Sequence, residues 1–263
     1  MWIIGERINP TGKPDLISAL TEQNRQFIQN EVRRQEQAGA QALDINVGVP
    51  GLDHIDAMRF VIQSAKDVTA LPLVIDEQDS EVIEAALDYA GNGAWMNTPV
   101  DSEKDFTHIT QLTNMFQATP LILPLKRGRL TESVSEHLEA AAQIIRRFEN
   151  SGISKERIVM DAMLFPLKAG KAKLMDVLER IKRLKSDLGV RSAVGLSNLS
   201  FGLKNRETLN AGFLKLAQAA GLDVAICDPL QKQVMEIANG SDQESPESNP
   251  KEFLRLAEAS LAG

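Results

Sequence analysis

The fold is decided by the stretch Arg191-Ser-Ala-Val-Gly-Leu-Ser-Asn-Leu-Ser-Phe-Gly-Leu-Lys-Asn-Arg206. Its first part, residues 192–196, is a short apolar run that predicts a buried β-strand. The run gives way abruptly to polar residues, with Asn198 just beyond the strand, and residues 207–219 then have the spacing of a helix. The stretch is therefore predicted to form a strand, a loop and a helix, with an amide side chain at the C-terminal tip of the strand.

The same order of strand, polar tip and helix recurs along the chain. Further buried-strand runs end in the polar residues Asn46, Asp76, Asn97, Asp161 and Asp228. About eight such units in 263 residues predict an α/β fold, a single (β/α)8 TIM barrel, whose usual size is roughly 250 residues. In that fold the C-terminal ends of the strands form one mouth, where active sites lie. A doubly wound parallel sheet is the alternative, because the alternation alone does not distinguish the two folds.

Composition narrows the class of protein. The net charge is −7, which argues against a surface for nucleic acid or for an anionic membrane. Every apolar run is shorter than the roughly 20 residues that a membrane-spanning helix needs. Cys227 is the one cysteine, so no intrachain disulfide can form, and the three histidines lack the spacing of a zinc site. We expect a cytoplasmic protein that binds neither nucleic acid nor membrane and holds no metal.

Periodicity and turn residues place the other elements. Those that matter below are a first strand at 2–5, a loop at 10–14, a helix at 21–40, a second strand at 42–46, a fifth strand at 120–124 that leads into a loop at 126–129, and a helix at 229–238. The polar segment 239–249 is predicted to be a linker. It leads to a C-terminal extra helix at 250–262, which is expected to cover the edge or base of the barrel. The whole chain, residues 1–263, is expected to form one domain.

Two polar residues on the second strand share a face. Asp44 and Asn46 are two residues apart, so their side chains point to the same side of the strand. Leu43 and Ile45 point to the other side. In a barrel, this alternation predicts that the polar pair faces the interior and that the apolar pair lies under the helices.

The strand tips at the predicted mouth are Asp and Asn, with no His, Cys or Lys among them. A general base that works at neutral pH is usually a His or a tuned Glu or Lys. Asp and Asn suit recognition instead, because a carboxylate pairs with two adjacent N–H groups and an amide offers both a donor and an acceptor. The pyrimidine half of a pterin presents such groups. The alternative is that these residues only cap loops and helices.

Several segments, in the same order over nearly the whole chain, resemble the pterin-binding methyltransferases that act with corrinoid proteins. They are Gly5-Glu-Arg-Ile-Asn9, Ala42-Leu-Asp-Ile-Asn-Val-Gly48, Asp76, Met96-Asn97, Asp161, and Gly195-Leu-Ser-Asn-Leu-Ser200 with Asn205-Arg206. The resemblance implies a β/α barrel, usually a homodimer. It implies transfer of a methyl group between N5 of tetrahydrofolate and the cobalt of a cobalamin carried by a separate corrinoid protein.

The resemblance also assigns residues to the pterin. It implies that Asp76, Asn97 and Asp161 hold the ring and that Asn198 lies close to N5. Three further residues in the matching segments are added to the predicted pterin contacts, namely Asp44, Asn46 and Arg206. The surroundings of N5 depart from the family pattern, because Glu77 stands where a small hydroxyl residue is expected and Phe201 where some members are polar.

Asn198 is the predicted catalytic residue. A methyl group on a neutral tertiary amine becomes transferable when N5 gains a proton or a strong hydrogen bond, whereas in the reverse direction N5 needs its lone pair. An amide can donate or accept without titrating, so Asn198 suits both directions. The sequence leaves the physiological direction open.

The cobalt is expected to come from a partner protein. The usual corrinoid-binding signature, Asp-x-His-x-x-Gly, is absent, since both Asp53-His54 and Asp105-Phe-Thr-His108 have the wrong spacing. Basic residues gather in the predicted loops at the mouth. Lys126, Arg127 and Arg129 are candidates to hold the glutamate tail of folate or to steer an acidic partner. Ordinary solvated loop charges are the alternative.

Two other functions remain open. One is that of a dihydropteroate synthase, which shares the barrel, but its usual late Ser-x-Arg-x-His element is missing and Pro229-Leu-Gln-Lys232 follows Asp228. The other is that of a non-catalytic subunit, which would bind folate and dock a corrinoid protein without transferring methyl.

Overall fold

The computed structural model describes residues 1–100, 103–240 and 250–262, and in these residues eight parallel strands close into a barrel. The parallel strands are β1 (Trp2–Ile8), β2 (Ala42–Ile45), β3 (Leu73–Asp76), β4 (Trp95–Val100), β5 (Thr119–Lys126), β7 (Val159–Asp161), β8 (Arg191–Gly195) and β9 (Val224–Cys227). Neighbours in the chain are neighbours in the barrel, and β9 pairs with β1 to close it. The predicted TIM barrel is confirmed, and the doubly wound sheet, which has two open edges, is excluded.

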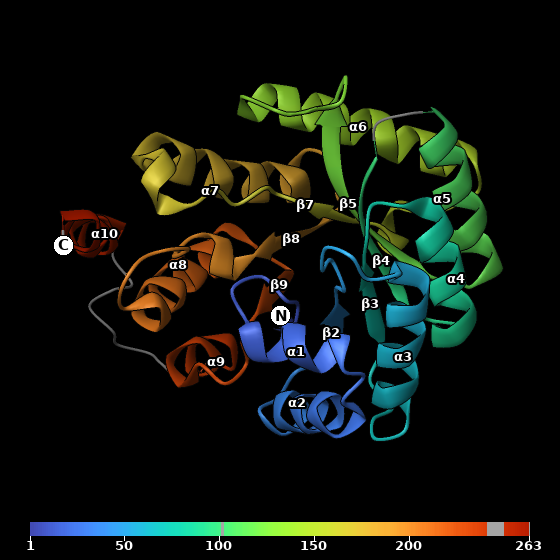
Figure 1. Cartoon of the computed structure of the whole chain (residues 1–263). Coiled ribbons are helices and arrows are strands. Elements are labelled where there is room, and N and C mark those ends of the chain that lie inside the picture. The colour runs from blue at the N-terminus through green and yellow to red at the C-terminus, as the bar shows by residue number, and fades with distance from the viewer. Residues whose placement is uncertain (101–102, 241–249, 263) are drawn as a thin grey trace.

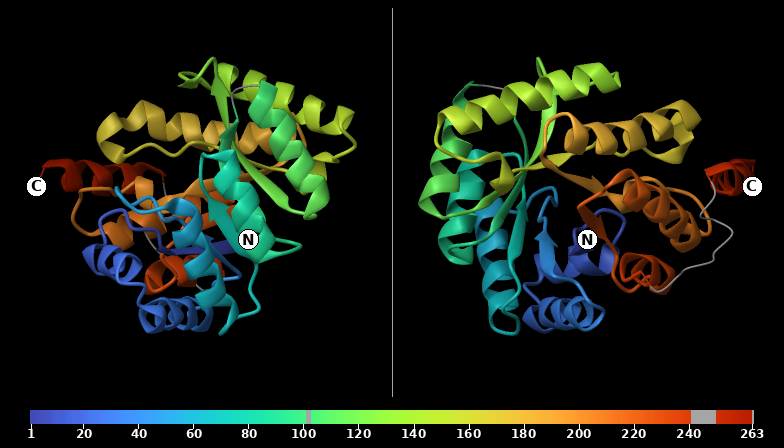
Figure 2. Two further views of the ribbon diagram at one scale, coloured as in Figure 1. Left: turned by 45° about the vertical axis from the view of Figure 1, so that its right-hand side comes forward. Right: turned by 180° about the vertical axis from the view of Figure 1, so that it is seen from behind.

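Helices surround the strands on the outside of the barrel (Figure 1, Figure 2). They are α1 (Pro14–Thr21), α2 (Arg25–Gln37), α3 (His54–Lys66), α4 (Ser80–Ala90), α5 (Glu103–Met115), α6 (Val134–Asn150), α7 (Lys171–Ser186), α8 (Arg206–Ala220), α9 (Lys232–Ala238) and α10 (Pro250–Ala262). The larger apolar core lies between strands and helices and includes Leu43 and Ile45, as the alternation along β2 predicts. Within the described ranges, none of the helices has the length and apolar character needed to cross a membrane.

A separate apolar cluster fills the inside of the barrel. It contains one side chain from each parallel strand in its main layer, namely Ile4, Ala42, Val74, Trp95, Leu121, Val159, Ala193 and Val224. Residues two apart on a strand point to the same side, so the next inward layer lies two residues further along. That layer is Glu6, Asp44, Asp76, Asn97, Leu123, Asp161, Gly195 and Ile226. The barrel interior therefore changes from apolar to mostly polar within one step toward its C-terminal mouth.

The first strand is longer than the sequence suggested. β1 continues past residue 5 to Ile8 and brings Glu6 into the barrel and Arg7 to its outside. The Arg7 guanidinium lies 2.5 Å from the Glu31 carboxylate and 2.9 Å from that of Asp228. Because this charge is paired, Arg7 can occupy a strand that packs under helices.

The predicted helix at 21–40 is confirmed for residues 25–37, which form α2, and a separate helix, α1, precedes it at 14–21. Pro14 was assigned to a loop, but it stands at the start of α1, where its fixed φ suits the first helical turn and its missing N–H costs nothing. Gln23 has a φ of 51° and ends the first helix. Asn24 then caps α2 by accepting a hydrogen bond from the Phe27 N–H.

The segment after β5 is a tight hairpin instead of the predicted loop. β5 reaches Lys126 and pairs antiparallel with the short strand β6 (Arg129–Leu130). Arg127 and Gly128, which connect them, have φ angles of 51° and 74°. Positive φ at both central residues is the geometry that two-residue hairpins favour.

The C-terminal region agrees with its prediction in part. α9 begins at Lys232 and not at 229, because the Asp228 carboxylate accepts the Leu230 N–H and holds a turn there. The linker predicted at 239–249 lies outside the described residues except for its first two positions. α10 occupies 250–262 as predicted, but it packs on the outer side of α8 and does not cover the edge or base of the barrel (Figure 1).

One aromatic side chain anchors α10, which leads to a test of this packing. Phe253 is fully buried, and its ring lies 6.4 Å from the ring of Phe213 on α8. We expect Phe253→Ala to lower the free energy of unfolding by about 3 kcal/mol, because it leaves a cavity at this contact. Chemical denaturation measures the change. Leu261→Ala, at an exposed site on the same helix, is the control and should change stability by less than about 0.5 kcal/mol. Equal effects of the two substitutions would contradict the packing of α10.

Candidate functional site

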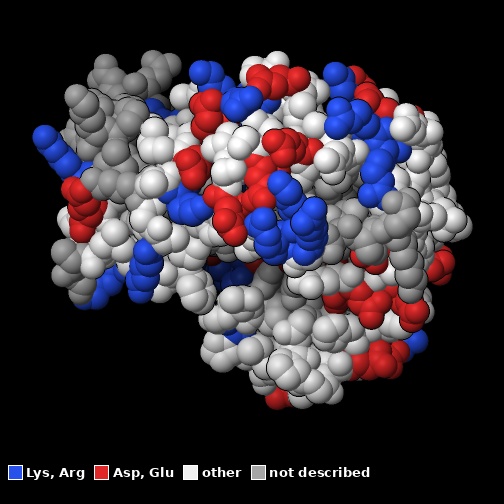
Figure 3. Space-filling model, turned by 90° about the horizontal axis from the view of Figure 1, so that it is seen from above, with Lys and Arg blue, Asp and Glu red and all other residues white. Residues whose placement is uncertain are grey.

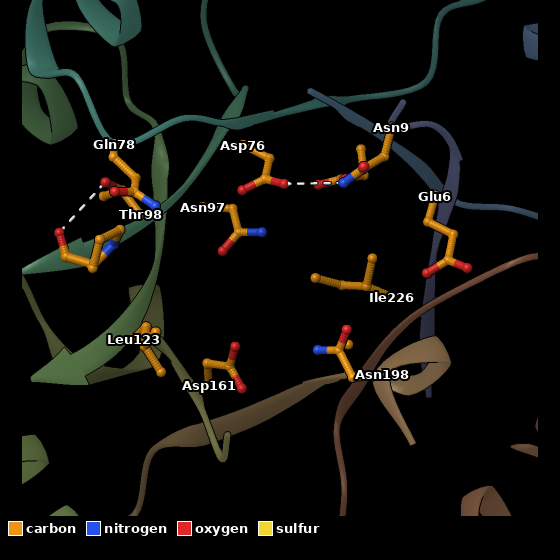
Figure 4. A pocket seen from close by; sticks show the side chains of 13 residues that line it. Glu6, Asn9, Asp76, Gln78, Asn97, Thr98, Leu123, Asp161, Asn198 and Ile226 are labelled. Carbon is orange, nitrogen blue, oxygen red and sulfur yellow. Dashed lines mark hydrogen bonds between the residues drawn. The ribbon is translucent and has the colours of Figure 1, made fainter. Parts of the chain in front are cut away.

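A cavity of about 270 Å³ opens at the C-terminal mouth of the barrel (Figure 4). It is lined by Glu6, Asn9, Asp44, Asp76, Gln78, Asn97, Thr98, Pro99, Leu123, Asp161, Gly195, Asn198 and Ile226. Asp76 and Asn97 lie across the cavity from Asp161 and Asn198 (Figure 4). The volume is just below the roughly 300–1,000 Å³ that is usual for small-molecule sites, so the cavity suits a compact ring system.

Two asparagine side chains donate hydrogen bonds to Asp76. Asn46 donates to Asp76 Oδ2 at 3.1 Å and to the Asp76 carbonyl at 3.2 Å, and Asn9 donates to the same Oδ2 at 3.4 Å. The Asn46 amide is itself oriented, because its Oδ1 accepts the Gly48 N–H at 2.8 Å. These donors to the carboxylate all use Oδ2, so Oδ1 is the oxygen that can meet a ligand. Asn46 thus positions Asp76 and does not line the cavity.

Asp161 stands where the chain turns sharply at the end of β7. Its Oδ1 accepts the Met163 N–H at 2.7 Å. Met163 has a φ of 60°, in the left-handed region that bulky residues seldom occupy. Strained backbone of this kind is concentrated at functional sites. The turn fixes the Asp161 carboxyl and directs it into the cavity (Figure 4).

Asn198 comes from a 3-10 turn, η3 (Leu196–Asn198), directly after β8. A Cβ atom at Gly195 would lie only 3.0 Å from Asn198 Nδ2, so a glycine is what lets this amide fold back toward the cavity. Ser197 donates a short hydrogen bond to the Glu6 carboxylate and ties the turn to β1. The stretch 191–206 therefore supplies the strand β8, the turn that follows it and the Asn198 amide on that turn.

Arg206 lies outside the cavity lining, although it was predicted to contact the pterin. Its guanidinium donates to the Ser197 carbonyl and to Ser200 Oγ, both at 3.1 Å. These bonds fasten the segment 197–200 to the start of α8. Arg206 therefore acts on the site through the turn that carries Asn198.

Burial makes the carboxyl groups of the cavity hard to ionise. It raises the pKa of both Asp76 and Asp161 to about 6, and it raises the pKa of Glu6. The pKa of Asp44 is raised well above its usual range, first by burial and then by the nearby charges of Asp76 and Glu6. A ligand that brings N–H groups restores the hydrogen bonds that these groups lost on burial. The cavity therefore favours a donor-rich or cationic ligand.

The sequence reasoning missed several residues that build the site. Glu6 and Asn9 line the cavity, and Lys13 fastens their segment by donating to the carbonyls of both residues at 2.9 Å. A signal was present, because these residues belong to the polar segment that follows the first strand. Gln78 and Thr98 line the cavity without any signal in the sequence. Asp228, a predicted strand tip, lies outside the lining and pairs with Arg7 instead.

The two residues that depart from the family pattern also lie outside the lining. Glu77 accepts from the Gln78 and Asp79 N–H groups through Oε1, and its Oε2 lies 3.0 Å from His54 Nδ1. Glu77 thus shapes the loop after β3. Phe201 is 55% exposed beside the turn that carries Asn198. Across the described part of the chain, no cluster of three or more potential metal ligands occurs.

The three basic residues predicted to contact a folate tail or a partner lie on the β5–β6 hairpin. Lys126 lies 3.2 Å from the Glu136 carboxylate, and Arg129 lies 2.7 Å from it. Arg127 is exposed at the turn. Over α6, basic and acidic side chains are intermixed on the surface (Figure 3). Ion pairing with acidic neighbours therefore offsets much of the positive charge that the sequence suggested here.

The raised pKa of Asp161 leads to a prediction about stability. The folded protein holds this proton up to about pH 6, whereas an unfolded chain releases it near 4. Ionised Asp161 therefore destabilises the ligand-free protein, and the penalty grows as pH rises from 4 to 7. We expect Asp161→Asn, which can still accept the Met163 N–H, to raise the free energy of unfolding by about 1–3 kcal/mol at pH 8.

Denaturant unfolding of both proteins between pH 4 and pH 8 measures this effect. The gain from Asp161→Asn should shrink toward zero at pH 4, where Asp161 is protonated in both states. Asp88→Asn, at an exposed position on α4, should show no such dependence on pH. A gain that is absent at pH 8, or that is the same at every pH, would contradict the raised pKa.

Comparison with known proteins shows which family the chain resembles. The family described as "Pterin binding enzyme" matches residues 5–228. Methionine synthase of Mycobacterium leprae (strain TN) is 27% identical over 237 residues, which cover 85% of this chain and 20% of that protein. The chain thus spans about a fifth of that relative. The methylcorrinoid:tetrahydrofolate methyltransferase of Eubacterium limosum is 23% identical over 240 residues, which cover 89% of this chain and 88% of that protein.

Solved structures show the same fold. Dihydropteroate synthase from Xanthomonas albilineans, in complex with 7,8-dihydropteroate, has a TM-score of 0.70 at 20% identity and covers 93% of this chain and 94% of that one. Dihydropteroate synthase from Thermus thermophilus also has a TM-score of 0.70, at 17% identity, and covers 92% of this chain and 94% of that one. The family match extends from β1 to just past β9 and includes every parallel strand that lines the cavity. The chain belongs to the family of pterin-binding enzymes.

Proposed function

We propose that this chain is a methyltransferase that moves a methyl group between N5 of tetrahydrofolate and the cobalt of a separate corrinoid protein. The observation that carries the proposal is the chemistry of the cavity. Four carboxyl side chains and three asparagine amides converge on it, and the described residues that line it include no His, Cys or Lys. Such a set recognises a donor-rich ring, and Glu6, whose pKa burial raises, is the one side chain in it of the kind that usually serves as a general base. Methyl transfer to or from cobalt needs no such base.

In this proposal, the pterin ring lies between Asp76 and Asp161, on opposite sides of the cavity. Asp76 and Asp161 each have one oxygen fixed by the protein and a second that can accept from the N–H groups of the ring. Asn97, which is paired in register with Asp76 on the neighbouring strand, offers a donor and an acceptor at the same level. In this proposal, these three residues hold the heterocycle, and Asp44 forms the buried floor behind them.

Asn198 is the proposed catalytic residue. Its amide can donate a hydrogen bond toward N5 as charge develops there, or accept one, without changing protonation state. The contact of its turn with Glu6 through Ser197, and the two bonds from Arg206, keep the amide in place before the ligand arrives. Preorganised groups of this kind are effective because they need no rearrangement during the reaction.

The proposal includes a separate corrinoid protein as the partner and allows methyl transfer in either direction. The name of the Eubacterium limosum relative states a methylcorrinoid and tetrahydrofolate, and an amide at N5 is compatible with either direction here. The cavity lies at the C-terminal mouth of the barrel, so in this proposal the partner delivers the cobalt of its corrinoid to this side. Arg127, exposed on the hairpin, remains a candidate contact for the folate tail or for that partner, and a homodimer in the cytoplasm remains part of the proposal.

Dihydropteroate synthesis is the second candidate, because dihydropteroate synthases have the same fold. Turnover separates the candidates. We expect the protein, mixed with methylcobalamin and tetrahydrofolate, to form 5-methyltetrahydrofolate well above the rate without protein, as measured by chromatography. Dihydropterin pyrophosphate with p-aminobenzoate should give no dihydropteroate. Folate binding without methyl transfer would favour a non-catalytic subunit, and dihydropteroate formation would replace the proposal.

The role of Asn198 has a kinetic test. We expect Asn198→Ala to slow methyl transfer by about 10²–10³-fold, because it removes one well-placed amide from the transition state. Folate affinity should fall by much less, since the other contacts of the ring remain. Single-turnover kinetics and calorimetric titration measure the two effects. Asn92→Ala, at an exposed position ahead of β4, is the matched control. Equal losses of rate and affinity would make Asn198 a binding residue only.

A further inference from the structure

Arg180 is an unusual residue behind the candidate site. It lies on α7, has no exposed surface and is the largest fully buried side chain in the described residues. It does not line the cavity, and neither the sequence motifs nor the proposed chemistry uses it. A permanently charged side chain at such a position is expensive to bury, so its presence calls for a physical account.

The guanidinium packs against the loop that follows Asp161. Nη1 donates to the Ala162 carbonyl at 3.5 Å, and Cζ lies 5.9 Å from the centre of the Phe165 ring. Nε and Nη2 have no hydrogen-bond partner in the described part of the protein. The charge is therefore held by the loop at 162–165, which contains the strained Met163, and its hydrogen-bonding capacity is largely unused.

Asp161 and Asp176 are the carboxylates that act on Arg180. Asp176 is half-buried on α7, one turn before Arg180, and Asp161 lies across the loop on β7. Lys173 of α7 faces the same Phe165 ring at 5.7 Å and adds positive charge. From α6, His137 is fully buried, and burial together with the charge of Arg180 lowers its pKa to about 3. His137 is therefore neutral, and it interacts with the backbone of Asp161 and not with its carboxyl group.

Two charged side chains act on the Asp161 carboxyl group, Asp76 and Arg180, and of these Arg180 favours its ionised form. Burial raises the pKa of its carboxyl, and Asp76 on the opposite side of the cavity raises it further. The Met163 N–H and the Arg180 charge act in the other direction. Apolar side chains of similar size often pack as well as a buried ion or better. Packing alone therefore does not explain an arginine at this position. A need for positive charge near the Asp161 carboxyl group does explain it.

We propose that Arg180 is a positioning residue for Asp161: its buried guanidinium holds the β7 exit turn through the Ala162 carbonyl and places a positive charge behind the Asp161 carboxyl, so that Asp161 meets the ring as an acceptor. The part of this inference that concerns ligand affinity rests on the proposed pterin function. The part that concerns the Asp161 carboxyl is a property of the ligand-free protein. The two parts can be tested separately.

The first test follows the Asp161 carboxyl without any ligand. Carbon-13 NMR of protein labelled at aspartate records the titration, and the signal is assigned by its loss in Asp161→Asn. We expect Arg180→Met to move the Asp161 midpoint to higher pH and Arg180→Lys to restore most of the difference. Arg191→Met is the matched control, because Arg191 is a partly buried arginine at the opposite end of the barrel. An Asp161 midpoint that is the same in wild type and Arg180→Met overturns the proposal, whatever the ligand data show.

The second test measures affinity for 5-methyltetrahydrofolate by calorimetry as a function of pH. We expect Arg180→Met to weaken binding about tenfold at pH 6, because more of its Asp161 is protonated there, and the difference from wild type should narrow by pH 8. The same substitution in an Asp161→Asn background should have no further effect. A loss that is equal at every pH and persists in the Asp161→Asn background would assign Arg180 a structural role and overturn the proposal. Failure of the wild type itself to bind 5-methyltetrahydrofolate would count against the pterin function and leave the NMR result to decide the role of Arg180.

Discussion

The candidate site depends on one constraint of barrel geometry: side chains two residues apart on a strand point to the same side. Val74 and Asp76 on β3, like Val159 and Asp161 on β7, therefore belong to successive layers inside the barrel. The apolar layer seals the lower side of the cavity against water. Carboxyl groups placed directly on this seal lose much of their hydration, which is why their pKa values are raised.

Desolvated acceptors need precise support, and both side chains and backbone groups provide it. A carboxylate that is poorly hydrated gains more from each hydrogen bond than an exposed one. In the structure, one oxygen of Asp76 is occupied by Asn46 and one oxygen of Asp161 by the Met163 N–H, so the second oxygen of each has a defined direction. The turn at Asn198 is fixed in the same way by Arg206. The rigid scaffold thus leaves only the outward-facing atoms for a ligand.

The barrel by itself does not determine the reaction. Proteins named as dihydropteroate synthases share this fold at low identity, whereas relatives named for methyl transfer match the sequence. Both groups are named for pterin or folate chemistry. In the proposed methyl transfer, the group beside the reacting nitrogen is the Asn198 amide, which the glycine at position 195 leaves room for.

The sequence by itself predicted the alternation of strands and helices and most of the polar layer, because buried strands and their tips are local patterns, whereas the pairing of β9 with β1 in the structure decided that the sheet closes. Asp44, Asp76, Asn97, Asp161 and Asn198 were all found from it, and all line the cavity. Only the tertiary structure showed that Glu6 joins them, because the charge of Arg7 beside it in the first strand is neutralised by Glu31 and Asp228, which are distant in sequence. It also decided that Asn46 and Arg206 support other residues, and that Arg180 lies buried behind Asp161. Partnership, burial and the direction of a side chain depend on contacts between distant segments, which periodicity in one segment does not encode.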